Sequence, residues 1–420
     1  MNLTRSRYHI ERNRILIFGA GKIGRSFIGQ LFGRSGYKLV FVDADPVLVE
    51  RLNKKQSYRI IIKGQKDEEI LITGLEAISA FDKAKVAENV ATAGIMAVSV
   101  GKNALEKVVP VIAEGLKIRY SASPDSPVDI ILAENMRSAA EFVKSELVKY
   151  LPSGFPVDDY VGLIETSIGK MVPIMPLAEI ENDPLIIFAE PYNTLILDAK
   201  AFRNPIPGVS GLAPKSNIKA WVDRKAFIHN LGHATAAYYG NHLYPDAVYM
   251  YEVLDHPEVK QFTREVMLQS AEVLRAAYPD DFTMQDLEEH IDDLISRFRN
   301  RALRDTIFRV GQDVQRKLGP DDRFMGAIHM GMRFGMPYDR IIKAMSYGFV
   351  FNAKDESGNS LPSDLAFINS ARTDLRKTLT EILGFDPVID KSVIDELTAA
   401  LSDASTQLEA GREGGVIGNR

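Results

Sequence analysis

The sequence predicts an α/β fold class: an N-terminal domain built on a parallel sheet, followed by a mainly α-helical C-terminal domain. In the first half, short apolar runs alternate with segments of helical spacing, which is typical of a parallel sheet covered by helices on both faces. From Ile218 onward, apolar residues recur at spacings of three and four, as in amphipathic helices. A chain of 420 residues is too long to fold around a single hydrophobic core of ordinary size. We therefore expect a Rossmann-type domain at 1–205, a helical domain at 206–400 and a flexible tail at 401–420.

The N-terminal half opens with a strand, a helix and a second strand. Arg14 to Phe18 is an apolar run that ends in glycines, and Lys22 to Ser35 carries apolar residues at helical spacing. Lys38 to Asp43 is the second strand, and Asp45 and Pro46 are residue types that begin a helix. The further elements expected in this half are a hairpin at 58–63 and 69–73, strands at 94–100 and 128–133, and a helix at 104–118.

Prolines interrupt the segment from Tyr160 to Ala199, which indicates short strands connecting the two domains. The strands expected there lie at 162–167, 171–175, 185–190 and 195–199. The helices expected after them lie at 221–239, 258–277, 284–300, 324–334, 338–349 and 363–383. The glycine-rich, polar end from Ser402 to Arg420 is expected to fray.

Composition excludes several function classes. The 51 Lys and Arg residues against 56 Asp and Glu residues give a net charge of −5, so there is no electrostatic reason to bind nucleic acid or an anionic membrane. The absence of cysteine excludes disulfides, thiolate metal sites and a cysteine nucleophile. No apolar run reaches the ~18 residues of a membrane span, and residues 1–14 lack the apolar core of a signal peptide. We expect a cytoplasmic protein, either a monomer or a small homo-oligomer.

The glycine motif Gly19-Ala20-Gly21-Lys22-Ile23-Gly24 lies between the first strand and the first helix. This position, with Asp43 ending the next strand about 20 residues later, is the context of a Rossmann-type dinucleotide site. The helix N-terminus is expected to bind the pyrophosphate, and Asp43 to accept hydrogen bonds from the adenosine ribose. A carboxylate there repels a 2′-phosphate, so the predicted cofactor is NAD. Gly101, at the end of a later strand, is expected to border the nicotinamide.

One predicted helix carries Lys225, Asn230 and His233. At ~100° per residue they lie at about 0°, about 140° and about 80° around the axis, so they can share one face. Oxidation of an alcohol needs a base and donors that stabilise the developing alkoxide. Lys225 suits the base if burial lowers its pKa, while Asn230, His233 and Asn135 offer donors. A solvated lysine is the plainer alternative. His229 and His233 are spaced like metal ligands, but the sequence has no HExxH motif, and we expect no metal site.

These motifs resemble the polyol-specific long-chain dehydrogenase family, within it the mannitol-1-phosphate 5-dehydrogenases. The resemblance covers about Ile15 to Leu383 and rests on four stretches: 18–29, 133–136, 224–234 and 297–318. It implies a metal-independent NAD enzyme that interconverts D-mannitol 1-phosphate and D-fructose 6-phosphate. It also implies that Lys225 is the general base, that Asn135 and Asn230 cradle the oxyanion, and that His233 and Arg297 contact the substrate.

The sequence departs from this family where Gly169 and Lys170 replace an Asp-Arg pair and Lys102 follows Gly101. Lys170 and Lys102 suit an anionic substrate or are surface lysines. A hexuronate or sugar-acid reductase, an unphosphorylated-polyol dehydrogenase and an enzyme like 6-phosphogluconate dehydrogenase therefore remain alternatives. A non-catalytic NAD-binding module is the alternative from another functional class.

Overall fold

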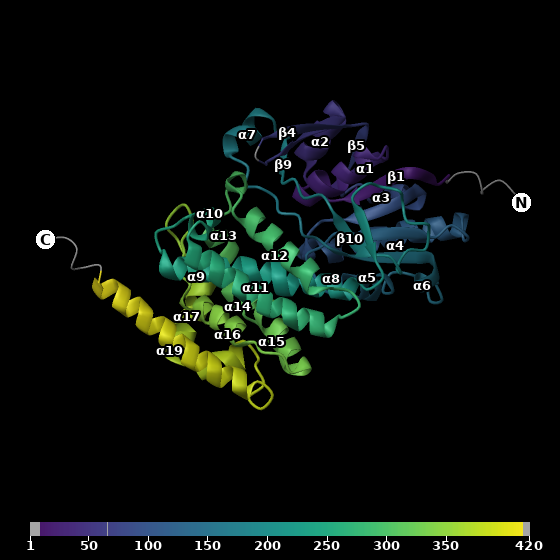
Figure 1. Ribbon diagram of the computed structural model, residues 1–420. Helices are drawn as coiled ribbons and strands as arrows, with labels where there is room; N and C mark the ends of the chain where they lie inside the picture. The colour runs from purple at the N-terminus through teal and green to yellow at the C-terminus, as the bar shows by residue number, and fades with distance from the viewer. Residues whose placement is uncertain (1–8, 65, 415–420) are drawn as a thin grey trace, which may run out of the picture. The chain divides into compact units, whose positions relative to one another are not determined.

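The computed structural model describes residues 9–64 and 66–414, without the side chains of 403–414. The chain forms two compact units, Met1–Val222 and Asp223–Arg420, and each is described by itself (Figure 1). Of the N-terminal segment that is expected to lack a signal peptide, residues 1–8 lie outside the described part.

The first unit is built on an eight-stranded sheet in the order β11-β10-β8-β7-β6-β1-β2-β5. Its strands are β1 (Glu11–Phe18), β2 (Lys38–Asp43), β5 (Leu75–Ser79), β6 (Ala93–Val98), β7 (Val128–Leu132), β8 (Val161–Ser167), β10 (Leu195–Asp198) and β11 (Leu212–Lys215). From β5 to β8 all neighbouring strands are parallel, whereas β10 runs antiparallel to β8. With the hairpin strands set aside, the parallel strands follow the order 3-2-1-4-5-6 of a Rossmann sheet, which confirms the predicted fold class.

Alternate residues of each parallel strand enter two different cores. Ile15 and Ile17 pack with the helical segment η1 (Gly24–Gly29), α1 (Gln30–Arg34) and α2 (Pro46–Lys55). Leu16 and Phe18 face the opposite side, where α3 (Lys83–Thr92), α4 (Lys102–Ala122) and α5 (Ala139–Leu147) cover the sheet. Because both faces are covered, the strands have no polar face, which explains their continuous apolar runs.

A second, three-stranded sheet has the order β4-β3-β9, and its strands are β3 (Ser57–Ile62), β4 (Glu68–Thr73) and β9 (Ile187–Ala189). The predicted hairpin is β3 with β4, which pair antiparallel. The strand predicted at 171–175 is wrong, because this segment has no regular structure and is followed by the short helix α7 (Leu177–Asn182). Pro173 and Pro176 have no backbone N–H for a strand ladder, and the Met171 N–H donates instead to the Glu190 side chain.

The second unit is helical. Its elements after α8 (Ile218–Arg224) include η2 (Lys225–Asn230), α9 (Leu231–Leu243), α10 (Met250–Leu254), α11 (Pro257–Ala277), α12 (Met284–Phe298), α13 (Ile307–Gly311), α14 (Val314–Lys317), α15 (Arg323–Phe334), α16 (Asp339–Ser346), η4 (Tyr347–Val350), α17 (Pro362–Thr373), α18 (Leu375–Lys377), η5 (Thr378–Ile382) and α19 (Lys391–Gly414). Helix α9 is buried along most of its length and packs against α10, α11 and α13.

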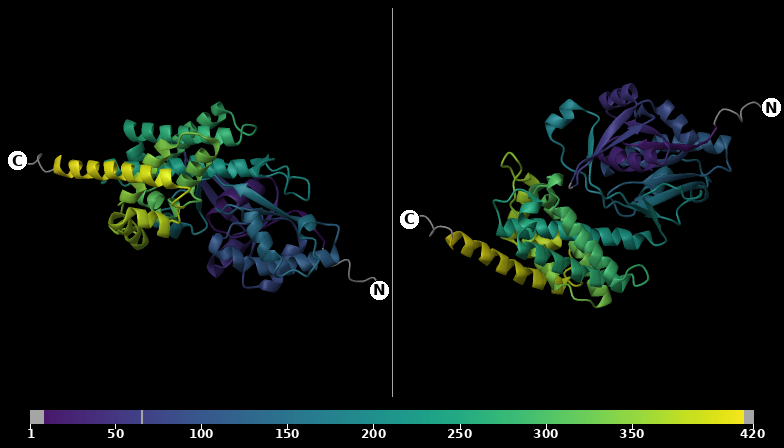
Figure 2. Two further views of the ribbon diagram at one scale, coloured as in Figure 1. Left: turned by 90° about the horizontal axis from the view of Figure 1, so that it is seen from below. Right: turned by 45° about the horizontal axis from the view of Figure 1, so that its top comes forward.

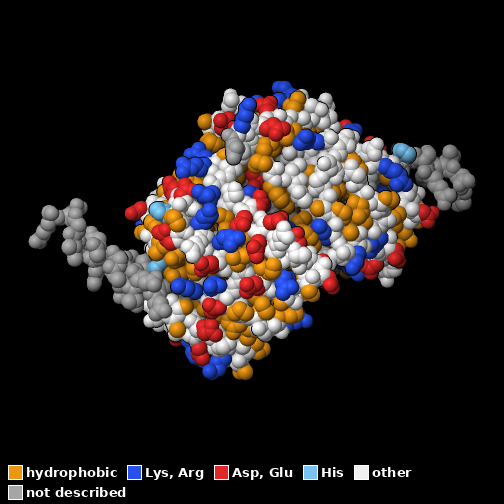
Figure 3. Space-filling view, in the orientation of Figure 1, with side chains coloured by type: hydrophobic (Ala, Val, Ile, Leu, Met, Phe, Trp, Pro, Cys, Tyr) orange, Lys and Arg blue, Asp and Glu red, His pale blue; other side chains and the backbone are white. Residues whose placement is uncertain are grey.

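The segment from Ser402 to Gly414, part of the end that is expected to fray, belongs to helix α19. Helix α19 continues to Gly414, as the long yellow helix in Figure 2 shows, and residues 415–420 lie outside the described part. Among the described residues, no helix is both long and apolar enough to cross a membrane. Lys, Arg, Asp and Glu side chains are interspersed over the face of the molecule shown in Figure 3.

Candidate active site

The predicted glycine motif forms a tight turn directly after β1. Gly19 has a φ of +94°, and a Cβ added there would lie 2.6 Å from the backbone oxygen of Ser99. A Cβ on Gly24 would lie 1.9 Å from the Gly19 oxygen, so the following helix begins in direct contact with the turn. At Gly21 an added Cβ meets nothing within 4 Å, which leaves room for a pyrophosphate to approach the backbone.

Asp43, the last residue of β2, lies beside this turn. Its Oδ2 accepts a hydrogen bond from the Ala20 N–H at 2.7 Å, and its Oδ1 accepts one from the Asp45 N–H at 2.9 Å. Each carboxylate oxygen has a second lone pair with which to accept a ribose hydroxyl. The loop and its carboxylate thus fit an NAD molecule.

The loop after β6 lies at the other side of the topological switch point. Gly101 has a φ of +84° and precedes α4. Glu134 holds this loop from the end of β7: its Oε1 accepts hydrogen bonds from the Val100 N–H at 2.7 Å and the Gly101 N–H at 3.1 Å. Glu134 is 5% exposed, and burial raises its pKa. Glu134 belongs to the family-like stretch 133–136, but its sequence position alone indicated no role for it.

Asn135 and Lys170 differ in exposure within this unit. Asn135 follows Glu134 and is exposed. Lys170 is only 6% exposed, so its interpretation as a surface lysine is wrong. Its ammonium donates to Gln30 Oε1 at 3.1 Å and Asn193 Oδ1 at 2.9 Å, and lies 5.1 Å from the centre of the Phe27 ring.

In the second unit, Lys225 and Asn230 begin and end a single π-helical turn, η2. The Leu231 N–H donates to the Ala226 oxygen five residues earlier, so the turn is wider than that of an α-helix. In such a turn, residues five apart come closer to one face than the 140° calculated for a regular helix. The local geometry therefore differs from the prediction, in a direction that brings Lys225 and Asn230 together.

The electrostatic environment of Lys225 suits a base. Burial and the nearby positive charge of Arg323 lower its pKa to about 8, although Asp322 acts in the opposite direction. Lys225 is partly buried, so its interpretation as a fully solvated charge is wrong. A lysine with this pKa carries a substantial fraction of free amine close to neutral pH.

His233 lies one turn further along, in α9, and is oriented by two neighbours. Its ring stacks on Phe298, with centroids 4.4 Å apart and planes at 9°. Its Nε2 lies 3.4 Å from Asp305 Oδ2, although the two atoms are not aligned for a hydrogen bond. Burial lowers the pKa of His233 despite this carboxylate, so we expect a neutral imidazole near pH 7.

The remaining predicted residue of this unit, Arg297, lies in the last turn of α12. Its side chain is 11% exposed, with Nη1 3.5 Å from an Asp293 oxygen. Burial and the charge of Arg297 lower the pKa of His229 well below its usual value, which places the guanidinium near the helical segment that carries Lys225, His229 and Asn230. Among the described residues there is no group of three or more side chains suited to holding a metal ion.

Sequence reasoning assigned no role to Asp305, Arg323 or Lys317. Arg323 Nη1 donates to the backbone oxygen of Asn230 at 3.1 Å. Lys317 is 6% exposed and donates to the Val310 oxygen at 2.6 Å, and burial with the Arg323 charge lowers its pKa to about 7. Arg309 and Lys317 lie in the stretch 297–318 that resembles the dehydrogenase family, but only the folded chain shows which charges lie near Lys225 and His233.

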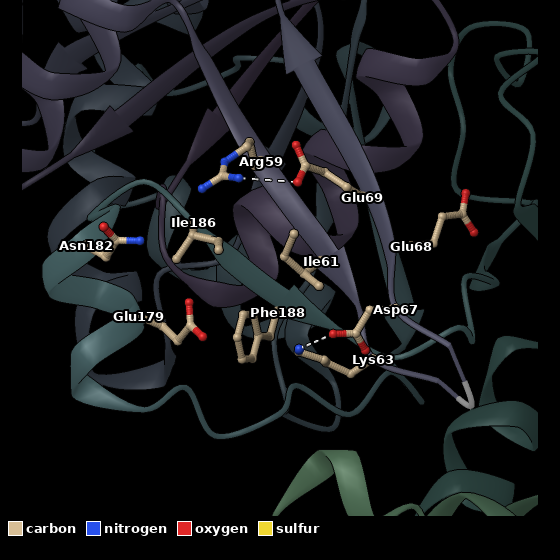
Figure 4. A pocket seen from close by; sticks show the side chains of 10 residues that line it. All are labelled: Arg59, Ile61, Lys63, Asp67, Glu68, Glu69, Glu179, Asn182, Ile186 and Phe188. Atoms are coloured by element: carbon tan, nitrogen blue, oxygen red, sulfur yellow. Dashed lines mark hydrogen bonds and ion pairs between the residues drawn. The ribbon is translucent and has the colours of Figure 1, made fainter.

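A separate hollow of about 410 Å³ lies on the three-stranded sheet (Figure 4). Ion pairs of Arg59 with Glu69 and of Lys63 with Asp67 cross its rim. None of the predicted site residues lines it.

Comparisons with known proteins agree with this architecture. Residues 13–211 match the model of the mannitol dehydrogenase Rossmann domain, and residues 217–402 match that of the mannitol dehydrogenase C-terminal domain. The fold is similar to Pseudomonas fluorescens mannitol 2-dehydrogenase, solved as a ternary complex with NAD and D-mannitol, with a TM-score of 0.72 and 14% identity over 98% of this chain and 96% of that one. It is also similar to a substrate-free D-sorbitol dehydrogenase, with a TM-score of 0.76 and 14% identity over 96% and 95%. The two domain matches, which together span most of the sequence, show that the chain belongs to the mannitol dehydrogenase family.

Proposed function

We propose that this protein is an NAD-dependent dehydrogenase that interconverts a polyol and the corresponding ketose, with Lys225 as the general base. The observation that carries the proposal is the position of Lys225 on a widened helical turn with Asn230, in surroundings that lower its pKa to about 8. Family membership supports the same chemistry. A non-catalytic NAD-binding module has no need of such a lysine.

Bound NAD would accept a hydride from the carbinol carbon. The free amine of Lys225 accepts the hydroxyl proton, and the side-chain amides of Asn230 and Asn135 donate to the oxygen as negative charge develops on it. His233, fixed by stacking on Phe298, donates to or orients a substrate hydroxyl. In the reverse direction, the Lys225 ammonium returns the proton to the oxygen.

Asp43 supports NAD over NADP, because its carboxylate repels a 2′-phosphate where the adenosine ribose binds. Gly19 to Gly24 and Gly101 complete the proposed cofactor site. The mannitol 2-dehydrogenase of similar fold was solved with NAD, which agrees with this choice.

We propose D-mannitol 1-phosphate and D-fructose 6-phosphate as the substrate pair, on the motifs at 18–29 and 224–234, with Arg297 and Lys170 as substrate-binding residues. One observation favours an unphosphorylated polyol instead. Arg309 pairs with Asp305 at 2.6 Å, so its charge is already balanced by a carboxylate that lies 3.4 Å from His233. The polyols for which the two similar enzymes are named, mannitol and sorbitol, also carry no phosphate.

The test is NADH formation with mannitol 1-phosphate, mannitol, sorbitol and hexonates, each with NAD and with NADP. We expect the highest kcat/KM with mannitol 1-phosphate and NAD. A higher kcat/KM with mannitol or sorbitol would refute the phosphorylated substrate but would still support an NAD-dependent polyol dehydrogenase. Failure to oxidise every polyol would overturn the proposed function.

A further inference from the structure

Helix α15 packs directly on the turn that carries Lys225. An added Cβ at Gly326 would lie 2.5 Å from the ring of Phe227, which is in the middle of η2. The missing side chain therefore allows the N-terminal half of α15 to approach the widened turn without a gap. Asp322 is the N-cap residue of α15, and its side chain accepts a hydrogen bond from the Arg323 N–H at 2.7 Å.

The first residue of α15, Arg323, connects this helix end to the turn. Its Nη1 donates to the backbone oxygen of Asn230 at 3.1 Å, and its Nε donates to Asp322 Oδ1 at 2.8 Å. Asn230 is the last residue of η2, where hydrogen bonding changes from the π-helical to the α-helical pattern. Where a π-helical turn meets an α-helix, the regular backbone hydrogen-bonding pattern is interrupted. A side-chain donor at this point gives the backbone oxygen an additional hydrogen bond and so stabilises the turn. Arg323 is 9% exposed, so this bond is shielded from water.

The same side chain supplies fixed charge next to Lys225. After burial, Arg323 is the largest cause of the lowered Lys225 pKa, and Asp322 opposes it. On its own helix, Lys225 also acts on His229, whose pKa is held well below its usual value by burial. His229 is therefore neutral near pH 7, and the two charges that act on the Lys225 pKa, those of Arg323 and Asp322, both come from the start of α15. An arginine stays protonated throughout the working pH range, so its effect is constant.

We propose that Arg323 is a positioning residue for the general base, which both fixes the turn carrying Lys225 and Asn230 and places a permanent positive charge next to the lysine. This inference rests on the proposed function, because it assumes that Lys225 acts as the base. It assigns Arg323 no contact with substrate or cofactor.

The test is the pH dependence of kcat/KM for polyol oxidation between pH 6 and 10 in variants of the full-length protein. In Arg323→Gln the positive charge is lost, so the ammonium of Lys225 becomes more stable. The rising limb of the profile, where kcat/KM increases with pH, therefore moves to higher pH. Activity below the limb then falls about tenfold for each pH unit of movement. In Asp322→Asn the opposing charge is lost, so the limb moves to lower pH. Arg333→Gln removes an exposed arginine in the last turn of the same helix and is expected to leave the profile unchanged.

Arg323→Lys separates charge from geometry, because it keeps the cation and loses the guanidinium fork. We expect its limb to stay near that of the wild type while kcat falls. The proposal is overturned if the Arg323→Gln limb coincides with the wild-type limb or moves to lower pH. If Arg323→Gln does not fold, the pH profile of Asp322→Asn tests the proposal instead. The proposal is overturned if the rising part of that profile stays at the wild-type pH or moves to higher pH. Lys225→Ala, measured alongside, distinguishes the two levels: a fully active Lys225→Ala refutes the proposed function, whereas an inactive one with no Arg323→Gln shift refutes only this inference.

Discussion

A lysine whose pKa is lowered to about 8 predicts a specific shape for the pH profile of polyol oxidation. Only the free amine can accept the hydroxyl proton, so kcat/KM follows the deprotonated fraction of Lys225. With a pKa of about 8, that fraction is about 9% at pH 7, about 50% at pH 8 and about 91% at pH 9. Oxidation is therefore expected to accelerate about 5.5-fold from pH 7 to 8 and only about 1.8-fold from pH 8 to 9.

Because the pKa of Lys225 is lowered, oxidation is expected to increase with pH at lower pH values than it would with a free lysine. Burial and Arg323 disfavour the ammonium, so the base becomes available at lower pH than a free lysine, whose amine fraction at pH 7 is only about 0.03%. The assay is NADH formation at low substrate concentration and saturating NAD in buffers of constant ionic strength. Reduction of the ketose needs the ammonium and is expected to fall over the same range. An oxidation profile that is flat between pH 7 and 9, or still rising tenfold per unit at pH 10, would refute Lys225 as a base with a lowered pKa.

Three further predictions concern the first unit. Gly24→Ala places a Cβ within 1.9 Å of a backbone oxygen and is expected to cost about 1–3 kcal/mol of stability in thermal unfolding. Gly21→Ala, where the space is open, is expected to leave Tm unchanged and to weaken NAD binding. Equal Tm values for the two variants would contradict this geometry. Asp43→Asn is expected to lower the ratio of kcat/KM for NAD over NADP by about tenfold or more, and an unchanged ratio would remove Asp43 from the cofactor site. Glu134→Ala leaves the Val100 and Gly101 N–H groups without their acceptor and is expected to raise KM for NAD. Glu134→Gln keeps an acceptor oxygen, so its KM for NAD is expected to stay closer to that of the wild type. Equal KM values for the two variants would argue against Glu134 as the residue that orders this loop.

Much of the first unit could be predicted because its signals are local. Continuous apolar runs, a glycine turn and a helix-starting Asp45 are each encoded within a few residues, and the alternation of strands with helices indicates a parallel sheet. Strand β5 and helices α3, α5 and α7 were missed, because they are at most ten residues long and their sequences are mixed in polarity. The segment at 171–175 shows the opposite error, since its apolar residues favour a strand that the proline within it prevents.

The helical segment that carries Lys225, Asn230 and His233 could be predicted only in part from the sequence. The spacing of Lys225, Asn230 and His233 could be read directly, but the π-helical turn could not, because the angles were calculated for a regular helix. Asp305 and Arg323 lie at least 70 residues further along the chain, and only tertiary packing brings them to this helix. The residues that carry the proposed chemistry were therefore predictable, while those that set their geometry and charge were not.

The central claim is tested most directly by Lys225→Ala, with turnover and NAD binding measured on the same preparation. Lys219→Ala, which removes an exposed lysine of α8, is the matched control. Loss of a positioned base predicts a fall in kcat of about 10²–10⁴-fold on the best polyol, with the NAD dissociation constant within about twofold of the wild type. A Lys225→Ala enzyme that turns over as fast as the Lys219→Ala control would contradict the account.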